Sequence, residues 1–267
     1  MVGKAEVIHA LICITFLCFG SLSSLVIYRL SPNNNNKDIN LFFPRSHCPS
    51  CKKNIANINL IPLIGFVKQR GRCSNCNVKI SFYYPINEIL HLIIGLVLYS
   101  IFGLSIQLLI AFLIAVILII LFILDYRFFL LPFNLNIALL LIGLIAIGYA
   151  EIFKISFLDY KNLSMSVAGA FIGFVFLWLV NFFFKLIKGY DGIGGGDFIL
   201  LASLGSITGP FALPFIILFG SLASILIYFL KIKTLSNQIP LGSGLVLGFL
   251  IFILLNYFEL LNIYSVL

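Results

Sequence analysis

Long apolar stretches dominate the pattern of hydrophobic and polar residues along the chain. A membrane-spanning helix needs about 20 apolar residues, and six uncharged runs reach that length: 7–28, 89–124, 128–150, 162–184, 198–230 and 234–258. Two of these runs, 89–124 and 198–230, are too long for one helix. Glycine and proline end helices, so we expect breaks at Gly103 and at Gly209-Pro210. The pattern predicts an all-α polytopic membrane protein of about eight transmembrane helices.

Composition supports the membrane class and excludes others. The 267 residues are 61% hydrophobic and 10% charged, whereas a soluble domain is roughly 45–50% apolar. The net charge of +8 is concentrated in residues 29–87, which is typical of a membrane orientation signal rather than of nucleic-acid binding. We therefore expect the lipid bilayer as a partner, no nucleic acid, and run 7–28 retained as a first helix instead of a cleaved signal.

Positive charge also predicts the orientation of the chain. Because Lys and Arg favour cytoplasmic loops, segment 29–87 should lie in the cytoplasm. Alternation across eight spans then leaves only Lys4, Lys154 and Lys161 of the basic residues on the outer side. This agreement between charge and span count supports the predicted topology.

Four cysteines in segment 29–87 form two Cys-x-x-Cys pairs. These pairs are Cys48-Pro-Ser-Cys51 and Cys73-Ser-Asn-Cys76. A two-residue gap lets a tight turn aim both sulfurs at one ion, and two such turns supply the four-sulfur shell that Zn²⁺ prefers. Four protein ligands leave no position for water, so the zinc would be structural. A pair of redox-active or unliganded Cys-x-x-Cys motifs is the alternative.

Two carboxylates stand at predicted helix ends. Asp125 follows the run 89–124 and Asp197 precedes the run 198–230, with two spanning runs between them, so both return to the same face of the membrane. Carboxylates beside the hydrocarbon are costly and usually functional. Two that meet would share one proton, which provides the base and the acid of an aspartyl protease.

Other interpretations of these carboxylates remain open at this stage. Each could cap a helix or pair with a nearby cation, but Gly192 and the run 194–196 before Asp197 would admit an extended peptide. A transporter could use the aspartates to relay protons or bind cations, although both lie at a membrane edge rather than at the midplane. A non-catalytic assembly factor would explain the cysteines but not the glycine-rich aspartate.

Several motifs together resemble the type IV prepilin peptidase family over nearly the whole chain. The motifs are Gly20-Ser21 with Val26 to Leu30, the tetracysteine loop with Arg70-Gly71-Arg72, Tyr84-Pro85 with Glu88, Asp125 with Leu130-Leu131-Pro132, and Gly194-Gly195-Gly196-Asp197. The last matches the GxGD signature of this class of membrane aspartyl protease. Each motif is weak alone, but their combination in this order is specific.

The resemblance implies a function and a division of the chain. Such enzymes remove the short leader of prepilins or pseudopilins after a glycine, at the cytoplasmic face of the bacterial inner membrane, and many then methylate the new N-terminal phenylalanine with S-adenosylmethionine. It implies a first transmembrane helix at 1–28, a zinc loop linked with methylation at 29–87 and a peptidase domain at 88–267. Asp125 and Asp197 would be catalytic, while Gly71 and Glu88 would belong to the cofactor site.

The chain also departs from the family at four positions. Members commonly have Asn at the place of Ser24, Asp at Phe133, Lys at Ile199 and the last proline of Pro-Phe-Gly-Pro at Ser243. These departures bear on efficiency and substrate range rather than on reaction type. The intact cysteine loop favours the bifunctional form over a peptidase-only form.

Overall fold

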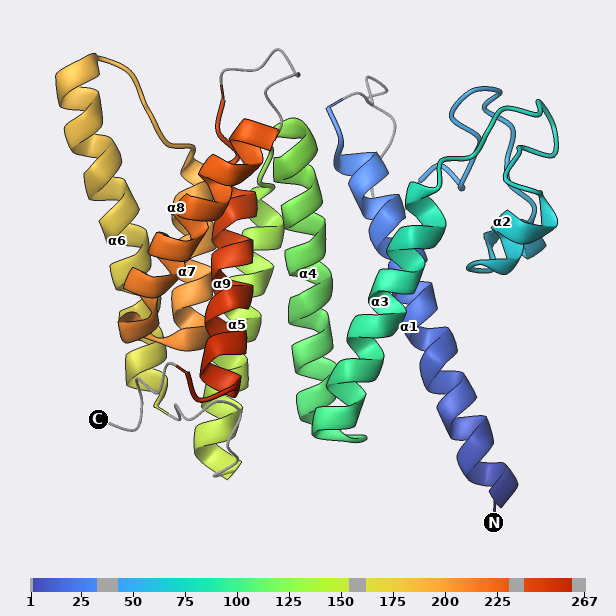
Figure 1. The fold of residues 1–267 in the computed structure, drawn as a ribbon, viewed down its shortest axis with the longest axis horizontal. Coiled ribbons are helices and arrows are strands. Elements are labelled where there is room, and N and C mark those ends of the chain that lie inside the picture. Colours follow the sequence, from blue (N-terminus) through green and yellow to red (C-terminus); the bar gives the residue numbers. More distant parts are fainter. Residues whose placement is uncertain (1, 33–42, 154–161, 231–237, 261–267) are drawn as a thin grey trace. The chain divides into compact units, whose positions relative to one another are not determined.

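The computed structural model describes residues 2–32, 43–153, 162–230 and 238–260, and within them every regular element is a helix. Figure 1 shows the eight apolar helices of this part of the chain. They are α1 (Val2–Leu30), α3 (Tyr83–Phe102), α4 (Ile106–Phe128), α5 (Phe133–Phe153), α6 (Leu163–Lys188), α7 (Gly195–Thr208), α8 (Leu213–Leu230) and α9 (Leu241–Tyr257). Three short elements complete the list: η1 (Asn57–Leu60), α2 (Ile64–Lys68) and η2 (Pro210–Ala212).

The expected all-α membrane fold is confirmed, with two helices shorter than the others. Six helices of the described chain are long and apolar enough to cross a membrane, namely α1, α3, α4, α5, α6 and α8. Helix α7 has only 14 residues, which rise about 21 Å, less than the roughly 30 Å of a hydrocarbon core. Helix α9 has 17 residues and is also short of that thickness.

Glycine divides both overlong runs at the expected places. Gly103 caps the C-terminus of α3 with a φ of +60°, and Gly209 caps α7 with a φ of +75°. Only glycine adopts these conformations without strain. The predicted breaks are therefore confirmed, while Lys154 and Lys161 of the orientation argument lie outside the described residues.

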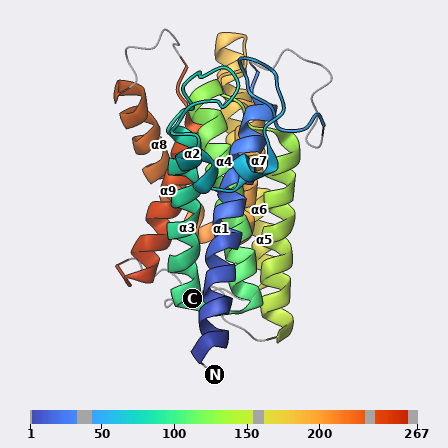
Figure 2. The ribbon, with the colours of Figure 1, turned by 90° about the vertical axis from the view of Figure 1, so that its right-hand side faces the viewer.

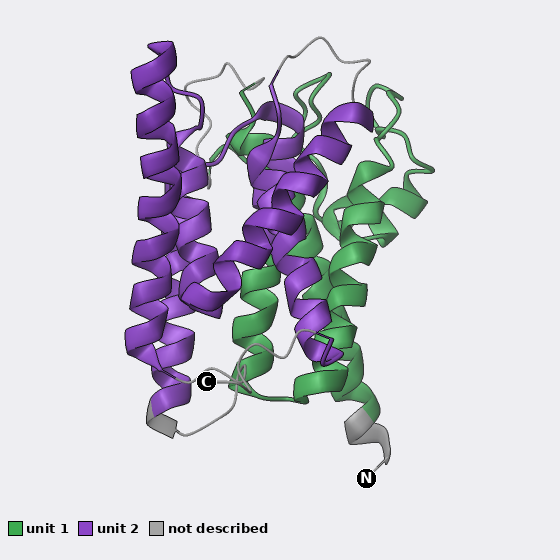
Figure 3. Ribbon diagram, turned by 60° about the vertical axis from the view of Figure 1, so that its left-hand side comes forward, with its two compact units in different colours: residues 1–116 green, residues 117–267 purple. Residues whose placement is uncertain are grey.

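The chain forms two compact units, which Figure 3 distinguishes by colour: residues 1–116 and residues 117–267. In unit 1, α1 and α3 pack side by side, and the loops of the cysteine segment gather at one end of the pair (Figure 2). Asn87 on α3 donates from Nδ2 to the Gly20 carbonyl, the Ser23 hydroxyl and the Ser24 hydroxyl of α1, at 2.9, 2.6 and 2.8 Å. A polar seam therefore joins these two helices.

In unit 2, α7 is the central helix. Nearly every residue from Phe198 to Thr208 is buried, because α5 and α6 pack against this helix and α9 also contacts it. Gly169 of α6 and Gly205 of α7 face each other so closely that a Cβ on Gly205 would come within 2.7 Å of the Gly169 carbonyl carbon. Hydrogen bonds accompany this close backbone approach, because Ser203 of α7 donates to the Asn136 carbonyl of α5 at 2.9 Å.

Candidate functional site

Asp125 lies in the last turn of α4, within unit 2, and its side chain is buried at 5% exposure. Ser243, near the start of α9, donates two hydrogen bonds to the same oxygen of this carboxyl. Its backbone N–H lies 2.5 Å and its hydroxyl 2.9 Å from Asp125 Oδ2. The carboxyl is therefore held by a residue 118 positions away along the chain.

Asp197 lies in the first turn of α7, directly after the glycine-rich segment. The absence of a side chain at Gly196 allows close packing, since a Cβ there would come within 2.6 Å of Leu131 Cβ. Asn136 of α5 donates from Nδ2 to the Gly196 carbonyl at 3.2 Å. The start of α7 is thus fixed against the segment that joins α4 to α5.

Leu131 lies between the start of α7, which carries Asp197, and the start of α9, which contacts Asp125. A Cβ on Gly242 would meet Leu131 Cδ1 at 2.7 Å and Asp125 Cγ at 3.1 Å, while Gly196 packs against the same leucine from the side of Asp197. The charge of Asp125 acts on that of Asp197. The structure therefore brings the two sequence-predicted carboxyls into one region of unit 2.

Asn181 of α6 holds the glycine-rich loop, and the sequence analysis missed this residue. Its Oδ1 accepts the backbone N–H groups of Gly192 and Ile193 at 2.9 and 3.0 Å, and its Nδ2 donates to Asp191 at 2.9 Å. Lys185 forms an ion pair with Asp191 at 2.9 Å in an exposed position. The hydrogen bond from Lys185, followed by that from Asn181, lowers the pKa of Asp191.

The sequence does mark Asn181 and Asn136 as residues that need a polar partner. Both are amides inside or next to runs that are otherwise apolar, and both are buried. Polar side chains in such places must find a partner. Which partner each one finds depends on the neighbouring helix, so the pattern alone marks the residues without assigning their contacts.

The four predicted metal ligands come together in unit 1. The sulfurs of Cys48, Cys51, Cys73 and Cys76 all lie within 4.8 Å of one another, and those of Cys48 and Cys76 are 3.8 Å apart. A tetrahedral site with Zn–S bonds of about 2.3 Å has S···S edges of about 3.8 Å. The spacing fits a metal ion bound by four thiolates and is too long for a disulfide bond.

The two knuckles that carry these cysteines share one backbone geometry. In the first, the Lys52 N–H donates to the Cys48 carbonyl at 2.9 Å and the Cys48 N–H donates to the Lys53 carbonyl at 3.0 Å. The second repeats both bonds with Cys73, Asn77 and Val78 in the equivalent places. The backbone N–H groups of Asn75 and Cys76 lower the pKa of the Cys73 thiol to about 6, which favours the thiolate that binds metal.

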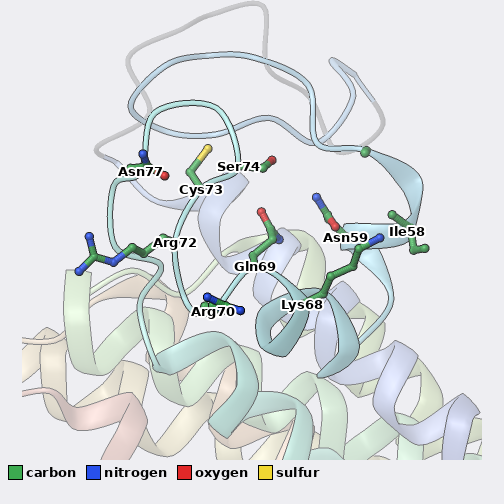
Figure 4. Close-up of a pocket in the computed structure, with 10 residues that line it drawn as sticks. Ile58, Asn59, Lys68, Gln69, Arg70, Arg72, Cys73, Ser74 and Asn77 are labelled. Atoms are coloured by element: carbon green, nitrogen blue, oxygen red, sulfur yellow. The ribbon is translucent and has the colours of Figure 1, made fainter.

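A hollow of about 520 Å³ lies beside the second knuckle (Figure 4). Cys73 itself contributes to its wall. Its other lining side chains are mostly polar or basic. They include Asn59, Lys68, Gln69, Arg70, Arg72, Ser74 and Asn77.

The two sequence-predicted cofactor residues occupy different places in unit 1. Gly71 lies between two arginines of the hollow with a φ of +66°, and a Cβ there would come within 3.1 Å of the Phe66 ring. Glu88 is buried on α3, and its Oε2 accepts the backbone N–H of Leu63 at 2.8 Å, just before α2. Glu88 thus joins the cysteine segment to the helix pair.

Known proteins match the chain over both units. A model described as the bacterial peptidase A24 N-terminal domain matches residues 14–102, and one described as the type IV leader peptidase family matches residues 112–230. No solved structure matches the chain.

Relatives named prepilin leader peptidase/N-methyltransferase share about a third of its residues. The Legionella pneumophila protein is 35% identical over 88% of this chain and 87% of its own length. The Klebsiella pneumoniae protein is 36% identical over 78% and 88%, and the Aeromonas hydrophila protein is 32% identical over 92% and 90%. These matches extend over both units and over most of the length of each relative, so the chain belongs to the type IV leader peptidase family.

Proposed function

We propose that the chain is a membrane aspartyl endopeptidase that removes the leader of prepilins or pseudopilins after glycine. It then methylates the new N-terminal phenylalanine with S-adenosylmethionine. The observation that carries the peptidase half is the placement of Asp125 and Asp197 in one region of unit 2. The names of the relatives support both halves.

The chemistry of the peptidase follows from two carboxyl groups that share a proton. The ionised member takes a proton from water that attacks the scissile amide, and the protonated member donates to the amide carbonyl oxygen. Gly195, where a Cβ would meet nothing within 4 Å, leaves room for an extended peptide backbone two residues before Asp197. A transporter, the alternative from sequence, is not favoured by the family of the chain.

The methyl-transfer half belongs to segment 29–87 of unit 1. The four cysteine sulfurs would hold a structural zinc ion, which stabilises the loop and supplies no open coordination position. We place S-adenosylmethionine, the methyl donor, in the hollow beside Cys73, where Arg70 and Arg72 suit its carboxylate and the amide side chains suit its nucleoside. Gly71 provides the left-handed backbone conformation between these two arginines, and Glu88 holds the loop against α3.

The location of the enzyme follows from its charges. The chain is a multi-pass membrane protein, and the basic segment 29–87 supports a cytoplasmic position for the cysteine loop in the bacterial inner membrane. Both aspartates then face the cytoplasm, which is where the leader of a substrate anchored by an apolar helix would be accessible.

A single mass measurement tests both activities. Purified protein is incubated with a prepilin-like peptide that carries a basic leader, a Gly-Phe junction and an apolar helix. We expect a product that lacks the leader, and a gain of one methyl group when S-adenosylmethionine is added. Asp125→Asn and Asp197→Asn should each reduce cleavage by about a thousandfold or more, because the carboxyls act as a unit.

The matched control is Asp191→Asn. Asp191 lies in the same loop as Asp197, but its carboxylate pairs with Lys185 in solvent, so we expect cleavage within about twofold of the wild-type rate. Normal cleavage by either of the Asp125 and Asp197 variants, in folded protein, would contradict the catalytic pair.

A further inference from the structure

The two aspartates differ in the hydrogen-bond donors that surround them. Oδ2 of Asp125 accepts both the backbone N–H and the hydroxyl of Ser243. The Asp197 carboxyl interacts with the Gly194 backbone, but its Oδ1 is buried and has no hydrogen-bond partner among the residues that the structure describes. The donors in this pair are therefore unevenly distributed, with two of them on one oxygen of Asp125.

The start of α9 explains why Ser243 reaches Asp125. The first backbone N–H groups of a helix have no acceptor within the helix, and Ser243 is the third residue of α9. Gly242, which precedes it, has no side chain to keep α9 away from the Asp125 carboxyl. Both partners are buried, with Ser243 fully so, so water does not compete for these bonds.

We propose that Ser243 is a positioning residue that keeps Asp125 as the ionised member of the pair and leaves the shared proton on Asp197. This inference rests on the proposed peptidase function. Hydrogen bonds to the charged form of a carboxyl favour that form, and two neighbouring carboxyls hold one proton between them. The orphaned Oδ1 of Asp197 then carries a hydroxyl that is free to donate to a substrate carbonyl.

The hydroxyl of Ser243 has a second possible acceptor, the Pro240 carbonyl at 3.1 Å. One proton serves one acceptor at a time, and a hydrogen bond to a carboxylate is stronger than one to a neutral carbonyl. The hydroxyl therefore points at Asp125 while that residue is ionised and turns to Pro240 when Asp125 takes up a proton. The backbone N–H has no such choice and stays on Asp125.

These roles give a balanced reaction. The water oxygen bonds to the scissile carbonyl carbon as Asp125 removes one water proton and Asp197 donates its proton to the carbonyl oxygen, which produces a gem-diol. The C–N bond then breaks, the amine nitrogen takes the proton held by Asp125, and Asp197 recovers a proton from a diol hydroxyl. Both aspartates return to their starting states, and water is the only co-reactant.

A proline at position 243 would remove both donors at once, because proline has no N–H and no hydroxyl. We therefore expect the two Ser243 donors to keep the enzyme active to lower pH than a variant with proline at 243.

The test measures the pH profile of kcat/KM for cleavage of the prepilin-like peptide by three forms of the full protein. Ser243→Ala removes the hydroxyl alone, and Ser243→Pro removes both donors. We expect the acidic limb of this profile to move to higher pH by about one unit in Ser243→Ala and by about two units in Ser243→Pro. At the wild-type optimum, kcat should fall while KM stays unchanged, because Ser243 acts through Asp125.

Ser224→Ala is the matched control, since Ser224 is a buried serine of the same unit that packs against Gly244 of α9 but donates its hydrogen bond within its own helix, to the Gly220 carbonyl. We expect its acidic limb to coincide with that of the wild type. An acidic limb that stays in place in both Ser243 variants would overturn the inference, as would a change in KM alone. The Asp→Asn variants decide the proposed function separately, because their loss of cleavage does not depend on Ser243.

Discussion

The two units of this chain are built around different centres. In unit 1, Asn87 shares the two protons of Nδ2 among three acceptors on α1, and four cysteines gather the loop into a single cluster. In unit 2, glycines let backbones touch, as at Gly169 and Gly205 between α6 and α7. Both units combine polar contacts with close packing, since a Cβ on Gly20 of α1 would meet the Glu88 Cα of α3 at 2.6 Å and Ser203 of α7 donates to the Asn136 carbonyl of α5. What distinguishes them is the cysteine cluster of unit 1 and the buried central helix α7 of unit 2.

This difference matches the chemistry proposed for each unit. A loop held by thiolates can present a polar hollow to a soluble cofactor without a large apolar core. A pair of carboxyls at the membrane edge instead needs a rigid, dry surrounding, and close helix packing around the buried α7 provides it. We therefore expect variants of the two units to affect the two activities separately.

Removal of the proposed metal should give the largest difference between the effects on methyl transfer and on leader cleavage. Chelation, or Cys48→Ser, would take away the zinc ion proposed for the four cysteines, and structural zinc contributes about 10 kcal/mol or more to small zinc folds. We expect methyl transfer to fall about a hundredfold or more, with cleavage within about twofold of the untreated enzyme. The product masses report both activities at once. Cys18→Ser, in an exposed cysteine of α1 outside the cluster, should change neither, and an equal loss of both activities on chelation would contradict the separation.

Gly205→Ala should break the packing of unit 2. The new Cβ would meet the Gly169 backbone, which has no flexible side chain to move aside, so we expect unfolding to become easier by about 1–3 kcal/mol. Hydrogen exchange followed by mass spectrometry should show the loss of protection in α6 and α7, with α1 and α3 unchanged.

Gly148→Ala is the matched glycine substitution. Only a methyl group of Leu163, at 3.8 Å, lies near the new Cβ, so we expect no loss, or a gain of up to about 1 kcal/mol from better helix propensity. Equal destabilisation by both substitutions would show that helix propensity, and not the contact of α6 with α7, governs this unit.

Substitution of one asparagine in each unit should have a smaller effect than the changes above. Asn181→Ala leaves two loop N–H groups without their acceptor, and we expect cleavage to fall about tenfold with methyl transfer unchanged. Asn87→Ala should weaken unit 1 by about 1 kcal/mol and leave cleavage unchanged.

Lys185→Gln serves as the control for Asn181. It removes only an exposed ion pair to the same loop, so we expect cleavage within about twofold of the wild type. Initial rates of leader removal measure all three variants. A loss from Lys185→Gln as large as that from Asn181→Ala would contradict the role of Asn181 as the acceptor that orders the loop.

Much of this molecule could be predicted from its sequence. The apolar runs predict the eight helices, Gly103 and Gly209 predict the two internal breaks, and the Cys-x-x-Cys spacing predicts which sulfurs meet. All of these are local properties, because a helix satisfies its backbone within a few residues and a bilayer of constant thickness demands a constant length of apolar sequence.

The tertiary structure alone decided how the site is built. The sequence predicts that Asp125 and Asp197 lie on one face of the membrane. Only the structure shows that the donors on Asp125 come from Ser243, 118 residues away, and that Asn181 accepts the backbone N–H groups of the loop before Asp197. Hydropathy does not encode which helix lies against which. A hydrogen bond acts over about 3 Å, so only the packed arrangement of helices determines which donor meets which oxygen.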